Sequence, residues 1–313
     1  LKKLIRRKMK KFIVTTTINS PTEATLKFAS MEGWQLIVVG DLKTPHEEYE
    51  KINCIYLHPD YQESTYKNLS DSIGWNCIQR RNIGLVDAYN RGADIVATVD
   101  DDNIPYDNWG KDLYIGKTIE VDLYEPKHDV FDPLSITQFN SVWHRGYPIE
   151  YVPTRYDVDY RGKTKRKVLI QANLWDGDPD IDAMARLSIK PCMKYSDITQ
   201  PYCSNTIAPF NSQNTFLARE VLPYYSVLPH VGRMDDIWGG YIVQKYFPGS
   251  VIYDKATVYQ DRNIQDLITN LEKEIIGYRN TLNLLKDLDN WSNYLPDGAR
   301  EFFDHYQKAF NKD

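Results

Sequence analysis

Residues 94–103 read Asp94-Ile95-Val96-Ala97-Thr98-Val99-Asp100-Asp101-Asp102-Asn103 and carry the most informative pattern of the chain. The first half of this stretch is apolar and rich in β-branched residues, which is typical of a strand buried on both faces. Three consecutive aspartates follow without an intervening turn. Because neighbouring carboxylates repel one another, we expect a cation beside them. The sequence therefore predicts a buried strand that ends at a ligand site.

The chain before this stretch alternates between short apolar strands and helices. Strands are predicted at residues 12–18, 34–40 and 52–57, and helices at residues 24–31 and 82–92. This alternation is typical of an α/β fold whose mostly parallel central sheet is flanked by helices. Ligands bind such sheets at the carboxyl ends of the strands, so residues 15–18 and 100–103 are expected to meet at one edge.

The remainder of the chain has weaker patterns. Residues 105–210 are rich in Tyr, Pro, Trp and Asp, and we interpret them as loops and short strands. Residues 264–288 and 299–310 have the apolar spacing of amphipathic helices. These two helices carry no obvious chemistry and are expected to pack on the core.

Charge is distributed unevenly along the 313 residues, whose net charge is −5. A mildly acidic chain is not expected to bind nucleic acid. Residues 1–12, however, carry seven basic side chains, and apolar residues at positions 1, 4, 5 and 9 follow helical spacing. This basic amphipathic segment, residues 1–11, predicts either peripheral contact with an anionic membrane or a solvated terminus. No apolar run is long enough to predict a transmembrane helix.

The aspartate run predicts a metal–diphosphate site. Asp100 and Asp102 offer the oxygen ligands that Mg²⁺ and Mn²⁺ prefer, and such ions also accept phosphate oxygens. The alternative is a solvated turn with an aspartate cap. Arg81 precedes the helix at residues 82–92, and an arginine beside a helix N-terminus favours anions.

Two further acidic motifs have more than one interpretation. Asp235 and Asp236 precede a predicted helix at residues 237–247, where either could cap the helix or act as a general base. Asp176 and Asp178 belong to an aspartate-rich stretch that lacks the glutamate of a calcium loop. We interpret this stretch as binding acceptor hydroxyls, with Trp175 either stacking on a sugar or belonging to the core.

Several of these stretches resemble those of known families. Asn82-x-Gly84 through Gly92, followed by residues 99–103, resembles the donor helix and DxD strand of GT-A glycosyltransferases. A closer resemblance is to the STELLO family of glycosyltransferase-like proteins. It is carried by residues 15–22, 33–41, 175–183, 208–215 and 233–241.

The resemblance implies a GT-A fold and a role for individual residues. It implies that the sugar donor, a UDP- or GDP-sugar, contacts Thr16, Thr17, Asp41, Arg81, Asp100, Asp101 and Arg262. Asp102, with Asp100, would ligate Mn²⁺ or Mg²⁺, and Asp236 would be the catalytic base. A late histidine that closes the metal site in many GT-A enzymes is missing from residues 259–263, so the third ligand stays open.

The resulting hypothesis is a metal-dependent glycosyltransferase that moves a sugar from a nucleotide sugar to a glycan hydroxyl. An inverting reaction with an aspartate base is expected, although exostosin-like enzymes with similar motifs leave a retaining outcome open. Residues 12–263 would form the catalytic domain, with 12–104 as its donor half and 105–263 as its acceptor half, followed by helices in 264–313. The alternatives are a sugar-nucleotide mutase and a catalytically silent scaffold. The compartment stays open between the cytoplasm and a membrane such as that of the Golgi.

Overall fold

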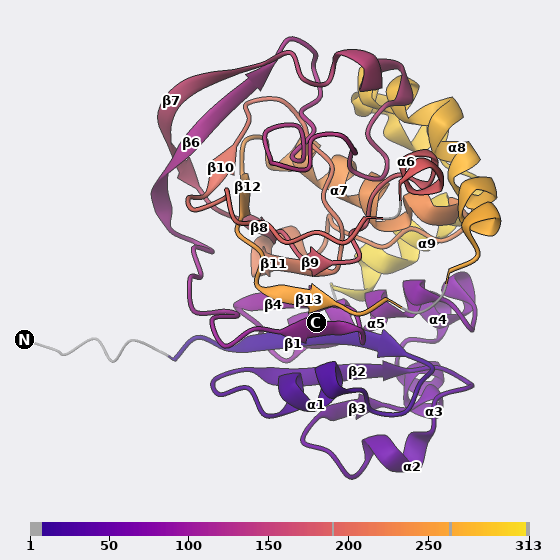
Figure 1. Cartoon of the computed structure of the whole chain (residues 1–313). Helices are drawn as coiled ribbons and strands as arrows, with labels where there is room; N and C mark the ends of the chain where they lie inside the picture. Colours follow the sequence, from indigo (N-terminus) through magenta and orange to yellow (C-terminus); the bar gives the residue numbers. More distant parts are fainter. Residues whose placement is uncertain (1–7, 190, 263–264, 311–313) are drawn as a thin grey trace, which may run out of the picture.

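The fold is built around a ten-stranded sheet in a computed structural model that describes residues 8–189, 191–262 and 265–310 (Figure 1). The strand order is β3-β2-β1-β4-β11-β8-β12-β10-β6-β7. The first four strands in this order pair in parallel. They are β1 (Lys11–Thr17), β2 (Gln35–Gly40), β3 (Ile55–Leu57) and β4 (Ile95–Val99). The predicted α/β class is confirmed, and the architecture is consistent with a Rossmann-like GT-A fold.

Helices connect these parallel strands and cover them. Helix α1 (Glu23–Ala29) begins where the Thr22 hydroxyl accepts a hydrogen bond from the backbone N–H of Thr25, at 3.1 Å. Helix α5 (Arg81–Asn90) packs on β1 and β2. A Cβ at Gly84 of α5 would lie 2.5 Å from Val14, so this position requires glycine for the close packing of helix on sheet.

The second half of the sheet is mixed rather than parallel. Strand β11 (Asn214–Ala218) joins β4 in antiparallel orientation, whereas β8 with β12 and β10 with β6 pair in parallel. The other strands are β8 (Ile170–Asn173), β12 (Val251–Asp254), β10 (Tyr202–Cys203), β6 (Thr118–Pro126) and β7 (Val158–Lys167). Strands β6 and β7 form a long ribbon with many exposed side chains, which explains its weak apolar periodicity.

A small second sheet brings three distant segments together. Strand β13 (Val258–Gln260) lies between β5 (Asn103–Pro105) and β9 (Asp176–Gly177). The backbone N–H of Asp261 also donates to the carbonyl of Asp102, at 3.1 Å. The end of the aspartate run therefore lies beside the segment that contains Arg262.

The C-terminal half supplies one central helix and two peripheral ones (Figure 1). Helix α7 (Asp235–Tyr246) is buried along most of its length. Helices α8 (Leu267–Lys286) and α9 (Asp297–Ala309) lie close to their predicted positions. The remaining α-helices are α2 (His46–Tyr49), α3 (Pro59–Thr65), α4 (Lys67–Ile73) and α6 (Ala183–Ser188). Helix α9 packs on α4, so the C-terminal helices contact the first half of the chain. The domain boundaries stay a prediction.

The N-terminal segment is described only from Lys8 onward. Residues 1–7 lie outside the described residues, so the amphipathic helix and its membrane contact stay predictions. Lys8, Met9 and Lys10 have no regular structure, and Lys11 is the first residue of β1. Within the described part of the chain, no helix is long and apolar enough to span a membrane.

Candidate functional site

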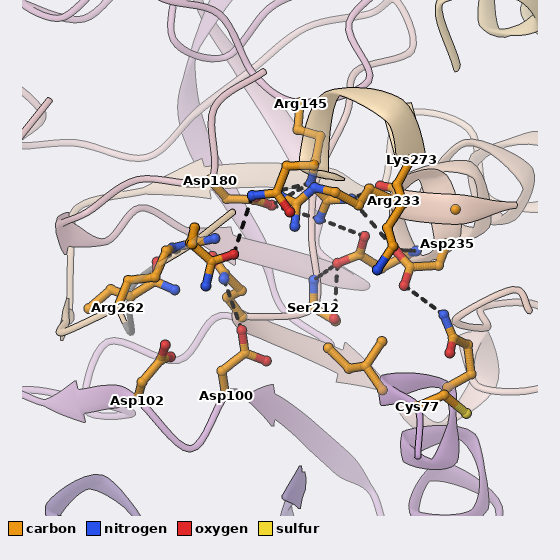
Figure 2. Close-up of a pocket in the computed structure, with 18 of the residues that line it drawn as sticks. Cys77, Asp100, Asp102, Arg145, Asp180, Ser212, Arg233, Asp235, Arg262 and Lys273 are labelled. Atoms are coloured by element: carbon orange, nitrogen blue, oxygen red, sulfur yellow. Dashed lines mark hydrogen bonds and ion pairs between the residues drawn. The ribbon is translucent and has the colours of Figure 1, made fainter. Parts of the chain in front are cut away.

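Two adjoining cavities lie at the carboxyl ends of β1 and β4. The strand-end cavity, of about 250 Å³, is lined by residues from β1, β2 and the aspartate run. The central cavity, of about 470 Å³, extends to α7 and α8 (Figure 2). Both are lined by Asp100 and Asp102 and by residues 76–78, so they share one wall.

The structure brings most of the predicted sugar-donor residues together in the strand-end cavity. Its lining includes Thr16, Thr17, Asp41, Arg81, Asp100, Asp101 and Asp102. Arg262 and Asp236 line the central cavity instead. Residues that are far apart in the sequence therefore meet at one edge of the sheet, as expected for the carboxyl ends of parallel strands.

Asp41 holds a loop between the two cavities. One carboxylate oxygen accepts hydrogen bonds from the backbone N–H groups of Leu42, at 2.6 Å, and Asn76, at 2.9 Å. The other accepts from the N–H of Cys77, at 3.2 Å. Asn76 has a φ of 57°, which is unusual for a residue other than glycine and is stabilised here by Asp41. Asp41 therefore fixes the backbone of residues 76 and 77, which line both cavities.

Thr17 and Asp101 tie the aspartate run to the end of β1. The Thr17 hydroxyl donates to an Asp101 carboxylate oxygen at 2.5 Å, and the Asn19 side chain donates to the same oxygen at 3.0 Å. The Thr22 hydroxyl donates to the backbone carbonyl of Asp101. Asp101 is thus oriented toward β1 and lines only the strand-end cavity.

Asp100 is held by two side chains. Buried Arg81 donates to one of its oxygens, and the side-chain amide of Gln213 donates to the other at 2.8 Å. Arg81 also donates to the Ser212 hydroxyl and, at 3.0 Å, to the carbonyl of Val99. The carboxylate of Asp100 is therefore oriented and its charge is matched before any substrate binds.

Asp102 is less well compensated. One of its oxygens, Oδ1, is buried and has no hydrogen-bond partner among the described residues. Burial and the neighbouring charge of Asp100 raise the pKa of Asp102 to about 7, although Arg262 has the opposite effect. A cation beside this carboxylate would offset both effects by stabilising its ionised form, so the two acids fit a divalent ion in part. Among the described residues, no group of three or more His, Cys, Asp or Glu side chains could hold a metal by itself.

Arg262 faces Asp102 across one end of the central cavity (Figure 2). Its side chain is only 7% exposed, and its Nε atom has no hydrogen-bond partner among the described residues. The nearest carboxylate contact of Nε is Asp178, at 4.0 Å, and Nη2 donates to Gln260 at 3.1 Å. Burial lowers the pKa of Arg262. A buried guanidinium that lacks a close counter-charge can bind an anion in the cavity.

Asp236 belongs to a dense ion-pair network at the start of α7. Arg145 donates to one of its oxygens at 2.9 Å, and the backbone N–H and hydroxyl of Ser212 donate to the other at 2.9 and 3.0 Å. Arg145 also donates to buried Asp180 at 2.7 Å. Burial alone would raise the pKa of Asp236, but Arg145 and the Ser212 hydrogen bonds lower it. Asp236 is therefore ionised, and both of its oxygens are occupied.

Asp235, its neighbour, has weaker partners. It accepts hydrogen bonds from the side chain of Gln79 at 2.9 Å and from the backbone N–H of Asp236 at 3.0 Å, and Arg145 approaches it only to 3.5 Å. Burial and the charge of Asp236 raise the pKa of Asp235 to about 7. Asp235 is thus a carboxyl group that exchanges a proton near neutral pH at the wall of the central cavity.

The predicted acceptor residues lie elsewhere. Trp175 is 3% exposed and packs edge-on against His144, with ring centroids 5.9 Å apart. Asp176 accepts hydrogen bonds from the Tyr106 hydroxyl and the Tyr195 backbone. Asp178 pairs with Arg186. None of these three residues lines either cavity, so their predicted contact with an acceptor stays a prediction.

Several residues of the central cavity were not among those predicted from the sequence. They are Ser212, Gln213, Arg145 and Lys273, whereas Asp180 and Arg233, which also line the central cavity, lie within residues 175–183 and 233–241 of the resemblance. Ser212 and Gln213 lie within residues 208–215, one of the stretches that carry the family resemblance, which was the available signal. Arg145 lies in an irregular segment, and no local pattern distinguishes it from a surface arginine.

Comparison with known proteins gives two plant relatives. The chain is 25% identical to the probable glycosyltransferase STELLO2 of Arabidopsis thaliana over an alignment of 301 residues. It is 26% identical to the probable glycosyltransferase STELLO1 of the same plant over 300 residues. Each alignment covers 85% of this chain but only 38% of the plant protein. No family model matches the chain. The similarity confirms the relationship to STELLO glycosyltransferases that the sequence motifs predict.

Proposed function

We propose that this chain is a glycosyltransferase of the GT-A type that moves a sugar from a nucleoside diphosphate sugar to a glycan hydroxyl. The observation that carries the proposal is the position of Asp100 and Asp102 on the wall shared by the two cavities. The nucleoside would occupy the strand-end cavity, and the sugar and acceptor the central one. The plant relatives named as probable glycosyltransferases support the same reaction class.

Asp102 and Asp100 would hold a divalent ion, Mn²⁺ or Mg²⁺, together with oxygens of the diphosphate. The support is chemical: an unpartnered buried oxygen on Asp102 and a pKa raised by burial and by Asp100. When bound, such an ion stabilises the negative charge of the leaving diphosphate. Arg262 would also stabilise the leaving diphosphate, from the opposite wall of the cavity. The N–H group at its buried Nε has no hydrogen-bond partner among the described residues and could donate to a phosphate oxygen.

The acceptor hydroxyl needs a carboxylate base, and Asp235 suits this role better than Asp236, the residue predicted from the sequence. The hydroxyl oxygen would form the new bond to the anomeric carbon while its proton passes to Asp235. The bond between that carbon and the diphosphate breaks, and its electron pair leaves with the diphosphate. Asp236, with both oxygens occupied by Arg145 and Ser212, would position the start of α7. This single displacement would invert the anomeric configuration.

The first experiment is a thermal melt with Mn²⁺ plus UDP or GDP. An enzyme with this site gains several degrees from a cognate nucleotide together with the metal, because ligands that bind only the folded state stabilise it. Asp102→Asn should lose the gain. Asp107→Asn, which changes an exposed aspartate five residues away, is the matched control and should keep it.

Product analysis with labelled nucleotide sugars then separates the alternatives. A transferase releases the nucleoside diphosphate and labels a glycan. A sugar-nucleotide mutase leaves the label on the nucleotide, in a rearranged sugar. A silent scaffold gives neither a product nor a nucleotide-dependent melting shift, and that pair of results would refute the proposal.

A further inference from the structure

A third cavity lies at the opposite edge of the central sheet. It has a volume of about 500 Å³ and is lined by the first residues of β1 and β2, whereas the candidate site lies where these strands end. We call it the basic cavity and define it by Lys8, Lys10, Lys11, Trp34 and Arg91. A ligand in this cavity would be separated from the candidate site by the length of the strands.

The wall of the basic cavity carries more positive than negative charge. Its lining includes four cationic side chains and no carboxylate among the described residues. Two carboxylates beside it offset part of this charge. Asp87 binds the guanidinium of Arg91 in an ion pair, and Asp94 accepts a hydrogen bond from the backbone N–H of Lys10 at 2.7 Å.

Lys8 and Lys11 are the least compensated of these cations. Neither ammonium group makes a hydrogen bond or ion pair with a residue in the described ranges, and the Nζ of Lys11 lies 4.7 Å from the ring centroid of Trp34. Burial and then the charge of Lys8 lower the pKa of Lys11. An anion between the two lysines would relieve this repulsion.

Arg91 and Lys10 make the opposite wall rigid. The Lys10 ammonium donates to the backbone carbonyl of Arg91 at 3.0 Å, and the guanidinium of Arg91 is held through its Nε by Asp87. Arg91 therefore lines the cavity with its guanidinium held in place by Asp87. The planar guanidinium of Arg91 and the ammonium groups of Lys8 and Lys11 match the several oxygens and the double negative charge of a phosphate monoester. A single carboxylate would neutralise only part of the positive charge of the cavity.

We propose that the basic cavity binds phosphate monoester groups, carried either by a lipid headgroup or by a free polyol phosphate. The inference does not depend on the proposed glycosyltransferase reaction, because the two sites share no residue. Binding here would attach or orient the domain and would leave the sugar-transfer site free.

The test uses the full chain and isothermal titration with inositol 1,4,5-trisphosphate. Lys8→Gln with Lys11→Gln should weaken binding by about 30-fold, since each lysine contributes roughly fivefold near a phosphate surface. Both side chains lack ionic partners, so the variant should keep its fold. The double variant Lys111→Gln with Lys165→Gln makes the same charge change at two exposed positions and should bind like the wild type. Asp102→Asn, at the opposite sheet edge, should also bind like the wild type, which excludes the sugar-donor site as the place of binding.

Vesicle co-sedimentation distinguishes the two sources of phosphate. Binding to phosphatidylcholine vesicles that contain phosphatidylinositol 4-phosphate, but not to vesicles of equal charge that contain phosphatidylserine, assigns the cavity to a lipid headgroup. Binding of the trisphosphate without binding of those vesicles assigns it to a free polyol phosphate. The proposal is overturned if neither the trisphosphate nor the phosphoinositide vesicles bind. It is also overturned if the Lys8/Lys11 variant binds as well as the wild type, or if only phosphatidylserine vesicles bind. General basic charge, including that of residues 1–7, would then be sufficient for binding.

Discussion

The guanidinium of Arg145 donates a hydrogen bond of 2.9 Å to Asp236 but approaches the adjacent Asp235 only to 3.5 Å. Because of this difference, the two neighbouring carboxyl groups have different pKa values. Arg145 keeps Asp236 ionised, and the charge of Asp236 in turn raises the pKa of buried Asp235. Environments that separate the pKa values of a carboxyl pair commonly mark distinct catalytic roles.

Asp235→Asn is expected to lower kcat by about 10²–10⁴-fold, the usual contribution of a general base. The base acts in its ionised form, so the wild-type rate should rise as the pH increases through about 7, where Asp235 loses its proton. The variant should lack this rise. The measurement is kcat against pH at saturating substrates.

Asp236→Asn is the comparison variant for this prediction. It removes one of the carboxylates that pair with Arg145 and should lower the melting temperature, because removing one partner from a buried ion-pair network is destabilising. The folded fraction should keep the rise in rate, displaced to lower pH because the charge of Asp236 no longer raises the pKa of Asp235. If Asp235→Asn keeps the rise and Asp236→Asn abolishes it, Asp236 is the base and the assignment is reversed.

Arg262→Gln is expected to act on kcat rather than on KM for the sugar donor. Stabilisation of a leaving group is worth about 10²–10³-fold in rate when a single preorganised donor is removed. Arg262→Lys should recover part of the loss, since it restores the charge but not the geometry. Steady-state kinetics with both variants checks this, and Arg161→Gln, at an exposed arginine, is the control. A rise in KM with kcat unchanged would show that Arg262 only binds substrate.

Asp41→Ala should weaken sugar-donor binding without removing a direct contact to the substrate. The change frees three backbone N–H groups, including those of Asn76 and Cys77, and the loop should lose its left-handed turn. We expect at least a tenfold higher Kd for the nucleotide by calorimetry and faster amide exchange in residues 74–78. Asp41→Asn, which keeps one acceptor oxygen, should have an intermediate effect. Unchanged exchange with weaker binding would indicate direct recognition by Asp41 instead.

The part of the site that could be predicted from the sequence lies on regular elements. The parallel strands and the aspartate run at residues 94–103 have local patterns, and the edge that carries the site then follows because ligands bind at the carboxyl ends of parallel strands. Thr16, Thr17, Arg81 and Asp100 were found in this way and do line the strand-end cavity. Their roles in the reaction stay predictions.

The network around Arg145 could not be predicted because it exists only in the folded chain. Arg145 lies 35 residues from Asp180 and 91 residues from Asp236, and none of these separations has a periodic signal. Asp176 illustrates the reverse problem. The aspartate-rich stretch around it was predicted to bind acceptor hydroxyls, yet Asp176 is buried and accepts hydrogen bonds from Tyr106 and Tyr195.

Asp132→Asn tests the cost of burying an acid away from both cavities. One oxygen of Asp132 accepts from the backbone N–H groups of Leu134 and His144, at 3.0 and 3.3 Å, and the other is buried without a hydrogen-bond partner among the described residues. Burial raises the pKa of Asp132 to about 7, and the backbone donors oppose this only in part. Between about pH 4 and 7 the folded protein therefore retains a proton that the unfolded chain releases. The contribution of Asp132 to the free energy of unfolding therefore falls as the pH rises from about 4 to 7, by about 1.4 kcal/mol for each unit of pKa shift. Above about pH 7 this contribution is constant.

Urea unfolding at pH 5 and pH 8 measures this contribution by difference. Other buried acids, among them Asp182 and Asp254, have raised pKa values as well, so the wild-type free energy of unfolding should fall over this range for several reasons. Asn at position 132 carries no charge at either pH, and the fall should be smaller in the variant by a few kcal/mol. Asp304→Asn, at an exposed aspartate of α9, should leave the fall unchanged. An equal fall in wild type and Asp132→Asn would mean that Asp132 is already ionised at pH 5, and that the two backbone donors suffice to hold its charge in the core.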